Sequence, residues 1–475
     1  HDFGALVVSL KEKGRSIANI TSTVINSRAR LMFLIFVMLL TWLVLAVFAM
    51  AIAGLFKAFP TSVLPINIEI IVAVFIGYLI YKKGMDALIP SIIALGILYL
   101  FVWIGTTTPI SLETFGVAPE NVQTTWIIFL FIYSGIASLL PVWLLLQPRD
   151  FINSHQLIVG LGLIFLGIFL AQPPIDAPAI RTASDSSAPP IFPMLFVTIA
   201  CGAISGFHGL VSSGTTSKQV NKLKDARLIG YGAMLGEGTL ALASTIAAIA
   251  GIALVSNCSL PSVGAVEKLS WSVYYDSWEH ATANKATAFV LGGGALLEQL
   301  RFPTTLAKTL MAVLVISFAA TTLDTATRIQ RFIISEIGTA INFSPLQNKY
   351  IATVCAVVPA ITLTMWSIPY GDGMKETAWV LWPIFGASNQ MLAALTLLII
   401  SLYFLAERKP ILPLLIPFGF ITFITLLTLF LKAGSFFQNN MILFVVDIVL
   451  IGLILWMLTE GMIAYRKQRT GLQTE

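Results

Sequence analysis

Charged residues are scarce in this 475-residue chain, and their scarcity excludes most classes of soluble protein. Only 11% of the residues are charged, whereas 57% are hydrophobic. Soluble domains carry about 25% charged residues. The composition therefore predicts an all-α integral membrane protein, with residues 1–475 forming one multi-pass transmembrane domain.

Cysteines and cofactor motifs are scarce as well. Cys201, Cys258 and Cys355 are widely spaced, which indicates neither a disulfide framework nor a metal site. The four histidines fall in unrelated places, and no Gly-Lys-Ser or Gly-Lys-Thr phosphate-binding loop is present. We therefore expect no cofactor and no metal. The net charge of +5 could suggest nucleic acid, but the basic residues follow the expected membrane topology instead, so no nucleic-acid partner is expected.

Long apolar runs are abundant, and a helix that spans a bilayer needs about 20 such residues. Twelve candidate spans lie at residues 31–53, 64–81, 87–105, 126–146, 156–171, 191–213, 228–255, 303–322, 350–367, 379–405, 411–431 and 441–464. Most of the 28 Lys and Arg residues fall in alternate connections between these spans, Arg149 among them. By the positive-inside rule, both ends of the chain are expected in the cytoplasm.

Three segments outside the spans carry further expectations. Residues 286–300 are predicted to be either a re-entrant or interfacial helix or an ordinary capping loop outside the membrane. Residues 332–341 are predicted to form a separate amphipathic helix on the cytoplasmic surface. Residues 1–10 resemble the end of an earlier apolar segment, so we expect the chain to begin inside a longer protein.

A carboxylate, Glu237, lies inside the glycine-rich seventh span. Counted at about 1.5 Å per residue from Arg227, it lies roughly 15 Å from the cytoplasmic edge, near the bilayer midplane. A charge at that depth is costly, so an ionisable residue there indicates a functional site. Glu237 is predicted to be a proton-coupling carboxylate, the alternative being a structural carboxyl that bonds to a neighbouring helix.

The sixth span ends in a polar stretch, residues 204–217, that disfavours a continuous helix. Non-helical backbone at membrane depth is tolerated only where it is buried or lines a cavity. Its freed amides could bind an anionic group, as they do in discontinuous helices, and the predicted substrate-binding residues here are Ser212, Ser213, Gly214, Thr215 and Thr216. His208 is predicted either to join the substrate site and a proton path or to be a buried hydrogen-bonding residue.

The tenth span contains a second polar interruption, where Pro383 and Gly386 weaken the helix. Gly386, Ser388, Asn389 and Gln390 are predicted to contact substrate, the alternative being interhelical packing through polar side chains.

Two opposite charges lie at the end of the eighth span. Asp324 and Arg328 are four residues apart and therefore share a helix face. They are predicted to form a structural or gating ion pair, and a direct substrate role is the lesser interpretation.

Several of these segments together resemble the carbon starvation protein A family. The resemblance is carried by residues 203–237 and by four shorter stretches, His1-Asp-Phe-Gly-Ala-Leu-Val-Val-Ser, residues 140–150, residues 322–328 and residues 382–390. It implies a bacterial or archaeal inner-membrane transporter, assigned to proton-driven pyruvate uptake in some members and to peptide uptake in others. It also implies a LeuT-like bundle of inverted repeats with discontinuous helices. Family members carry upstream helices that this sequence lacks, so we expect it to be N-terminally incomplete.

The resulting hypothesis is a proton-coupled secondary transporter in the cytoplasmic membrane. It would import a small carboxylate, with pyruvate as the first choice, as part of a response to carbon or nutrient starvation. Oligopeptide uptake and a non-transporting nutrient sensor are the alternatives, and Na⁺ stays open as the coupling ion. The sequence shows no nucleophile with a paired base, so an enzyme is not expected.

Overall fold

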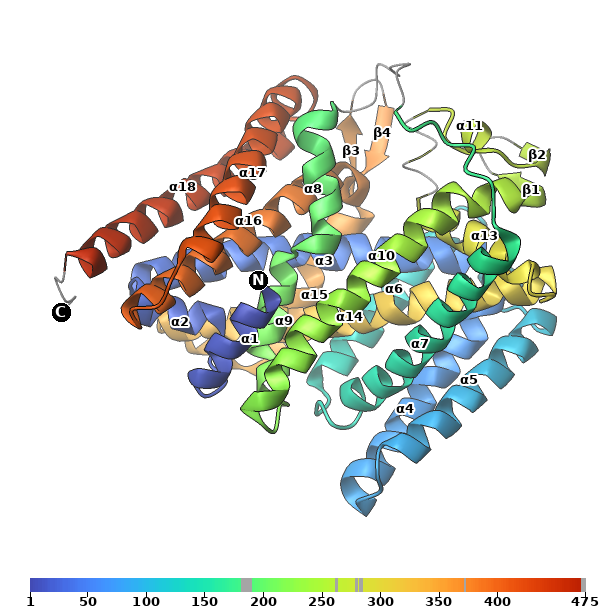
Figure 1. The fold of residues 1–475 in the computed structure, drawn as a ribbon, viewed down its shortest axis with the longest axis horizontal. Helices are drawn as coiled ribbons and strands as arrows, with labels where there is room; N and C mark the ends of the chain where they lie inside the picture. Colours follow the sequence, from blue (N-terminus) through green and yellow to red (C-terminus); the bar gives the residue numbers. More distant parts are fainter. Residues whose placement is uncertain (181–189, 261–263, 278–280, 282–284, 371–372, 471–475) are drawn as a thin grey trace. The chain divides into compact units, whose positions relative to one another are not determined.

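A computed structural model describes residues 1–180, 190–260, 264–277, 281, 285–370 and 373–470. The chain divides into two compact units, which are described separately (Figure 1). Unit 1 comprises His1–Val47, Pro190–Gly238 and Ala326–Glu475, and unit 2 comprises Phe48–Pro189 and Thr239–Thr325. The boundaries fall within three helices, α3 (Ser27–Ala58), α10 (Ala233–Ile249) and α14 (Thr304–Ala340).

The predicted helical membrane protein is confirmed in its general form. Ten helices in the described residues are long and apolar enough to cross a bilayer, and two shorter apolar helices accompany them, Ala286–Glu298 and Lys349–Met365. The count of twelve spans is therefore too high by this criterion, because the sixth span is broken and the ninth is only 17 residues long. Two short antiparallel hairpins lie between helices and leave the predicted helical membrane architecture unchanged.

Unit 1 is built around α16 (Thr377–Ala406). From residue 384 to residue 402 every residue except Gly386 is buried. The surrounding elements of this unit are α1 (Asp2–Lys11), α2 (Ile17–Val24), α8 (Ile191–Ala203), α9 (Gly206–Gly214), α15 (Lys349–Met365), α17 (Leu412–Asn439), α18 (Met441–Arg469) and the hairpin β3 (Ser367–Tyr370) with β4 (Gly373–Glu376). Because this part of α16 is buried, its polar side chains must form their hydrogen bonds within the protein.

The described residues of unit 2 form six α-helices, besides the parts of α3, α10 and α14 that belong to it, and one hairpin. Its elements are α4 (Val63–Lys83), α5 (Leu88–Thr107), α6 (Val122–Leu139), α7 (Leu146–Ala171), α11 (Trp271–Tyr274), α13 (Lys285–Glu298) and the hairpin β1 (Ser256–Leu260) with β2 (Gly264–Lys268). Close packing at glycines holds it together. A Cβ on Gly77 of α4 would lie 2.4 Å from the Leu144 carbonyl oxygen, and one on Gly292 of α13 would lie 1.9 Å from that of Ala247. Such contacts let backbones approach where side chains could not fit.

Two sequence predictions are corrected by these elements, and one pair of alternatives is decided. The expected surface helix at 332–341 is the continuation of α14, which runs unbroken for 37 residues. Of the two alternatives for residues 286–300, the helix is found and the capping loop is not, because Lys285–Glu298 form the largely buried helix α13. Arg149, expected in a cytoplasmic connection, lies in the first turn of α7 and is fully buried.

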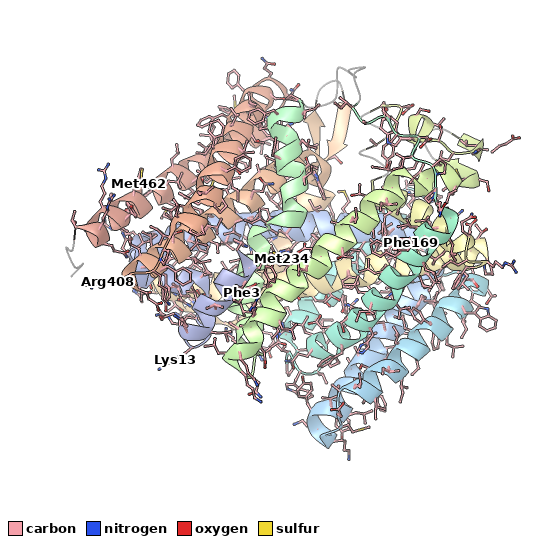
Figure 2. All side chains as sticks on the ribbon, in the orientation of Figure 1. Phe3, Lys13, Phe169, Met234, Arg408 and Met462 are labelled. Carbon is pink, nitrogen blue, oxygen red and sulfur yellow. The ribbon has the colours of Figure 1, made fainter. Side chains whose placement is uncertain are left out.

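The outward faces of the long helices carry large apolar side chains. Phe169 on α7 is 72% exposed and Met462 on α18 is 55% exposed (Figure 2). Exposed apolar residues of this size are unusual in such numbers on soluble monomers, and they are what lipid chains contact in a membrane. The apolar exterior therefore agrees with a multi-pass membrane protein.

Candidate functional site

A break in the helical backbone separates α8 from α9 in unit 1. α8 ends at Ala203 and α9 begins at Gly206, so the non-helical residues are Ile204 and Ser205. The break predicted within residues 204–217 is therefore found, but at Ile204–Ser205 and not at Ser212–Thr216, because α9 is helical through Gly214 and the Thr215 N–H donates to the Val211 carbonyl over 2.9 Å. The amides from Ser212 to Thr215 are thus used within the helix.

Asn389 of α16 holds the start of α9. Its Oδ1 accepts from the Phe207 N–H over 2.9 Å, and its Nδ2 donates to Ser205 Oγ over 2.9 Å. A Cβ on Gly206 would lie 2.2 Å from the Asn389 carbonyl oxygen, so the absence of a side chain permits this approach. Asn389 therefore satisfies an N–H group that the helix start leaves unpaired.

Gln390 contacts the other side of the break. Its Nε2 donates to the carbonyl oxygens of Phe196 and Val197 in α8, over 3.1 and 2.5 Å. The expected weakening of the tenth span at Pro383 and Gly386 is not found, because α16 is one continuous helix. Of the two predicted interruptions, only the one in the sixth span is found, between α8 and α9. The tenth span, α16, supplies the polar side chains that bond to the backbone of α8 and α9.

Two predicted substrate residues take structural positions. Ser213 is fully buried, its hydroxyl donates to the Gly209 carbonyl over 2.8 Å, and it accepts from the Ile17 N–H over 3.2 Å. Ser388 is fully buried, and its hydroxyl has no hydrogen-bond partner among the described residues. Asn389 contacts the start of α9 at Ser205 and Phe207, and along the axis of this helix Ser212 lies about 9 Å and Gly214 about 12 Å from Gly206. A molecule as small as pyruvate could not contact both ends.

The fold brings His208 and Glu237 together and adds a third residue, Asp2. His208 Nδ1 lies 3.3 Å from Asp2 Oδ2, and His208 Nε2 lies 3.6 Å from Glu237 Oε1. The three side chains are 16–33% exposed. An imidazole between two carboxylates can hold a proton on either nitrogen, so the cluster has the composition of a proton-transfer site. We refer to Asp2, His208 and Glu237 as the acid–imidazole cluster.

A π-helical turn, Leu228–Gly232, precedes α10 and so positions Glu237. A Cβ on Gly230 would lie 3.0 Å from Phe3 Cα, so this turn packs closely on α1, which carries Asp2. Single π turns inside helices are frequent at functional sites. Gly230 thus lets the π turn approach α1 closely, whereas a Cβ on Gly236 or Gly238, beside Glu237, would meet nothing within 4 Å among the described residues.

The acid–imidazole cluster is also the group in the described residues that could hold a metal ion. One ligand atom from each of its residues lies within 4.8 Å of the other two. Sequence spacing predicted no metal ligands because the three residues are far apart in the chain. The direct contacts of His208 with both carboxylates suit a shared proton, and one histidine with two carboxylates also suits a divalent cation.

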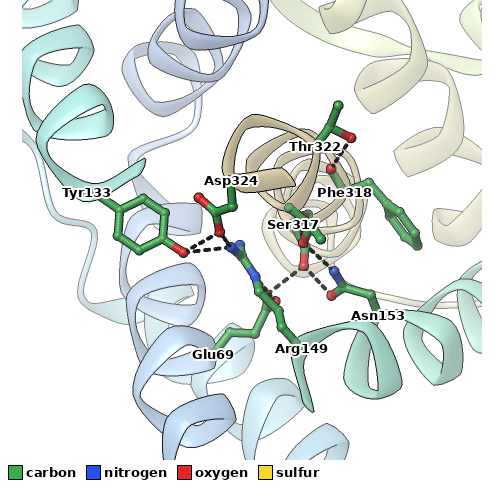
Figure 3. Close-up of polar contacts among 9 residues, drawn as sticks. Glu69, Tyr133, Arg149, Asn153, Ser317, Phe318, Thr322 and Asp324 are labelled. Carbon is green, nitrogen blue, oxygen red and sulfur yellow. Dashed lines mark hydrogen bonds and ion pairs between the residues drawn. The ribbon is translucent and has the colours of Figure 1, made fainter. Parts of the chain in front are cut away.

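A second polar cluster lies in unit 2, and its six residues form one network (Figure 3). We name it the buried network; its members are Glu69, Tyr133, Arg149, Asn153, Ser317 and Asp324. Arg149 Nε donates to Glu69 Oε1 over 2.9 Å, and Arg149 Nη1 donates to Asp324 Oδ2 over 2.9 Å. Two of the three guanidinium nitrogens of Arg149 are thus paired with carboxyl groups, one from Glu69 on α4 and one from Asp324 on α14.

The sequence analysis missed most of the buried network. It named Asp324 but paired it with Arg328, a pairing that stays a prediction, whereas the structure joins Asp324 to Arg149 and to the Tyr133 hydroxyl. Glu69 could have been found, because it is a carboxylate inside the second predicted span, as Glu237 is inside the seventh. Asp2 carried no such signal, because it lies outside the twelve predicted spans.

Comparison with known proteins confirms the resemblance seen in the sequence. Residues 1–428 match the family "Carbon starvation protein CstA". A "Peptide transporter CstA" from Mycobacterium tuberculosis is 29% identical, with 86% of this chain and 59% of the relative covered. A "Pyruvate/proton symporter BtsT" from Escherichia coli is 28% identical, with 84% and 63% covered. The chain thus spans about three fifths of the length of these relatives.

Among solved structures, the chain is similar to a manganese transporter from Eremococcus coleocola. The identity is 15%, 98% of this chain and 94% of the other are covered, and the TM-score is 0.40. A mutant of the same transporter gives 14% identity and a TM-score of 0.37. These scores are too low to support an argument, so the LeuT-like arrangement of inverted repeats stays a prediction.

Proposed function

This chain belongs to the carbon starvation protein CstA family, a family of membrane transporters, and we propose that it forms part of a proton-coupled carrier of small carboxylates. The observation that carries this proposal is the acid–imidazole cluster, in which His208 contacts Asp2 and Glu237. One imidazole between two carboxylates can take up a proton and release it as its surroundings change. His208 lies on α9 itself, just after the break, and Asp2 and Glu237 lie on α1 and α10.

Pyruvate is the proposed substrate, and protons are the proposed coupling ion. A protonated His208 would supply the positive charge that attracts a carboxylate, and protonation of Glu237 would remove a competing negative charge. One relative is named a pyruvate/proton symporter, which supports this choice. The proposed location is the bacterial cytoplasmic membrane, with both ends of this chain in the cytoplasm.

Peptide uptake is the second candidate, and a specific feature of the cluster favours it. Two carboxylates, Asp2 and Glu237, flank one imidazole, and such a pair could hold the ammonium group that a peptide has and pyruvate lacks. Several relatives are named peptide transporters.

The experiment that tests these proposals is uptake of labelled pyruvate into proteoliposomes under an imposed proton gradient. The chain would be compared with a version extended by the upstream helices of its family. Gradient-driven pyruvate uptake that excess dipeptide does not inhibit is the expected result. Inhibition by dipeptide would favour the peptide candidate. Absence of gradient-driven uptake by the folded, extended protein would contradict the pyruvate proposal.

A further inference from the structure

The buried network contains a hydroxyl that faces two hydrogen-bond acceptors. Ser317 Oγ lies 2.6 Å from Glu69 Oε2 and 2.6 Å from Asn153 Oδ1. A serine hydroxyl has one hydrogen to donate, so it can satisfy only one of these oxygens. The Asn153 amide is oriented by its Nδ2, which donates to Thr321 Oγ1 over 2.7 Å, while the Thr321 hydroxyl donates to the Ser317 carbonyl over 3.0 Å. The chain of bonds therefore needs one more hydrogen.

A proton on Glu69 supplies that hydrogen. Glu69 Oε2–H would donate to Ser317 Oγ, and the Ser317 hydroxyl would then donate to Asn153 Oδ1. One hydrogen would then lie between Glu69 Oε2 and Ser317 Oγ, and another between Ser317 Oγ and Asn153 Oδ1. If Glu69 is ionised instead, two buried acceptors share one donor, which leaves a fully buried polar group without its bond.

The guanidinium of Arg149 gives a second, independent indication. Its Nε and Nη2 can donate two parallel hydrogen bonds to the two oxygens of an ionised carboxylate. Glu69 uses only Nε, and Arg149 Nη2 is buried without a hydrogen-bond partner among the described residues. A neutral carboxylic acid offers one carbonyl oxygen to the arginine and turns its hydroxyl elsewhere, and this is the geometry observed.

The second carboxylate of the network has the surroundings of an ionised group. Asp324 Oδ2 accepts from the Tyr133 hydroxyl over 2.6 Å and from Arg149 Nη1 over 2.9 Å. Around Glu69, the charged or titratable groups on neighbouring helices are Arg149 and Asp150 on α7, Asp324 on α14 and Tyr133 on α6, and Asp150 interacts electrostatically with Arg149 and Asp324. α5, which packs against α4, contains Tyr99 and no charged residue. Of the two carboxylates, Glu69 is the one whose bonds call for a proton.

We propose that Glu69 is a proton-binding site, separate from the acid–imidazole cluster, that exchanges one proton during transport. In the protonated state Glu69 donates to Ser317, as described. On release, the Glu69 O–H bond breaks, a water molecule accepts the proton, and the resulting Glu69 carboxylate turns to pair with both Nε and Nη2 of Arg149. Ser317 then loses its bond to Glu69 and keeps its bond to Asn153 Oδ1, which couples the proton to the contact of α4 with α14. The coupling to transport rests on the proposed function, whereas the proton site itself does not.

Infrared difference spectroscopy of the whole chain in liposomes tests the site directly. Wild type minus Glu69→Gln at neutral pH is expected to show a carboxylic-acid C=O band. The exposed carboxyl of Glu113 offers a matched control, and wild type minus Glu113→Gln is expected to show none. Ser317→Ala should retain the acid band but shift its frequency, since the Glu69 hydroxyl loses its acceptor. Absence of the Glu69 band in protein with a native melting profile would overturn the proposal. Should Glu69→Gln fail to fold, an acid band that does not move in Ser317→Ala would overturn it equally.

A transport measurement separates this proposal from the proposed function. The pH dependence of gradient-driven uptake is expected to flatten in Glu69→Gln and to stay normal in Glu113→Gln. An acid band with an unchanged pH dependence would overturn the exchange of the proton during transport. If wild type carries neither pyruvate nor dipeptide, the proposed function fails, and the infrared band still decides whether Glu69 binds a proton.

Discussion

The two polar clusters of this protein differ in how completely the fold encloses them. In the acid–imidazole cluster, His208 and Glu237 are about one third exposed, and the contacts are 3.3 and 3.6 Å long. In the buried network, Glu69 and Arg149 have no exposed side-chain surface, and the hydrogen bonds are 2.6–2.9 Å long. Carboxylates are thus used in two different environments.

The difference teaches what each cluster can do. Loose contacts between partly exposed groups cost little to rearrange, because water or a ligand can replace each partner. Buried charges held by short bonds are costly to separate, because an unpaired charge in a low-dielectric interior loses its solvation without compensation. The first cluster is suited to meeting a substrate, and the second to a change between two defined states.

Removal of Arg149 should have the largest effect on stability. Arg149→Met leaves the buried Asp324 carboxylate without its cation and Glu69 Oε1 without its donor, and we expect it to lower the free energy of unfolding by about 3–5 kcal/mol. Thermal unfolding in detergent checks this, with Arg469→Met at the exposed end of α18 as the control. Adding Glu69→Gln and Asp324→Asn to Arg149→Met should recover part of the loss. A melting temperature of Arg149→Met equal to that of wild type would contradict the comparison.

A methyl group at the start of α9 tests how firmly the first cluster is positioned. Gly206→Ala places a Cβ 2.2 Å from the Asn389 carbonyl oxygen and 2.4 Å from Leu392 Cβ, and such overpacking typically costs about 1–3 kcal/mol. Gly214→Ala, at the other end of the same helix, meets nothing within 4 Å and serves as the matched control. Unfolding measurements should separate the two variants. Equal stabilities would mean that the α9–α16 contact is looser than described.

Glu237→Gln should affect transport more than stability. We expect gradient-driven uptake to fall by at least about tenfold, which corresponds to about 1.4 kcal/mol, because the amide cannot take up a proton. The free energy of unfolding should change by less than about 1 kcal/mol, as for other partly exposed ion pairs. Uptake measured across a pH series, with exposed Glu120→Gln as the control, checks this prediction. An unchanged pH dependence would exclude Glu237 as a coupling group.

Glu407, just after the end of α16, gives the smallest expected effect. Hydrogen bonds from Lys409 and Lys11 lower the pKa of Glu407 to about 2, below the ordinary value of about 4.3. The depressed pKa means that its stabilisation is fully present above about pH 4.3 and is lost as the pH falls towards 2. Glu407→Gln should therefore lower the melting temperature slightly at pH 7 and by less at pH 4. An equal decrease at both pH values would show that the ion pairs are not its cause.

Hydrophobic periodicity and length predicted most of the fold, because a bilayer span needs a long apolar run wherever it occurs. The runs at 64–81, 87–105 and 411–431 correspond to α4, α5 and α17. Breaks in the helices were harder to place. Glycine and serine residues indicated a break between 204 and 217, but the contact of Gly206 with α16 put it at Ile204–Ser205. Likewise Pro383 suggested a weak helix, yet α16 is continuous from Thr377 to Ala406.

The sequence by itself determined that this is a helical membrane protein of the CstA family and that His208 and Glu237 are unusual for their surroundings. Those conclusions depend on composition, local pattern and motifs, which are properties of neighbouring residues. Only the tertiary structure decided which charges meet, because Asp2 and Glu237, or Glu69 and Arg149, lie on helices far apart in the chain. A helix fixes the spacing of its own side chains, but packing between helices decides which of them share a buried site.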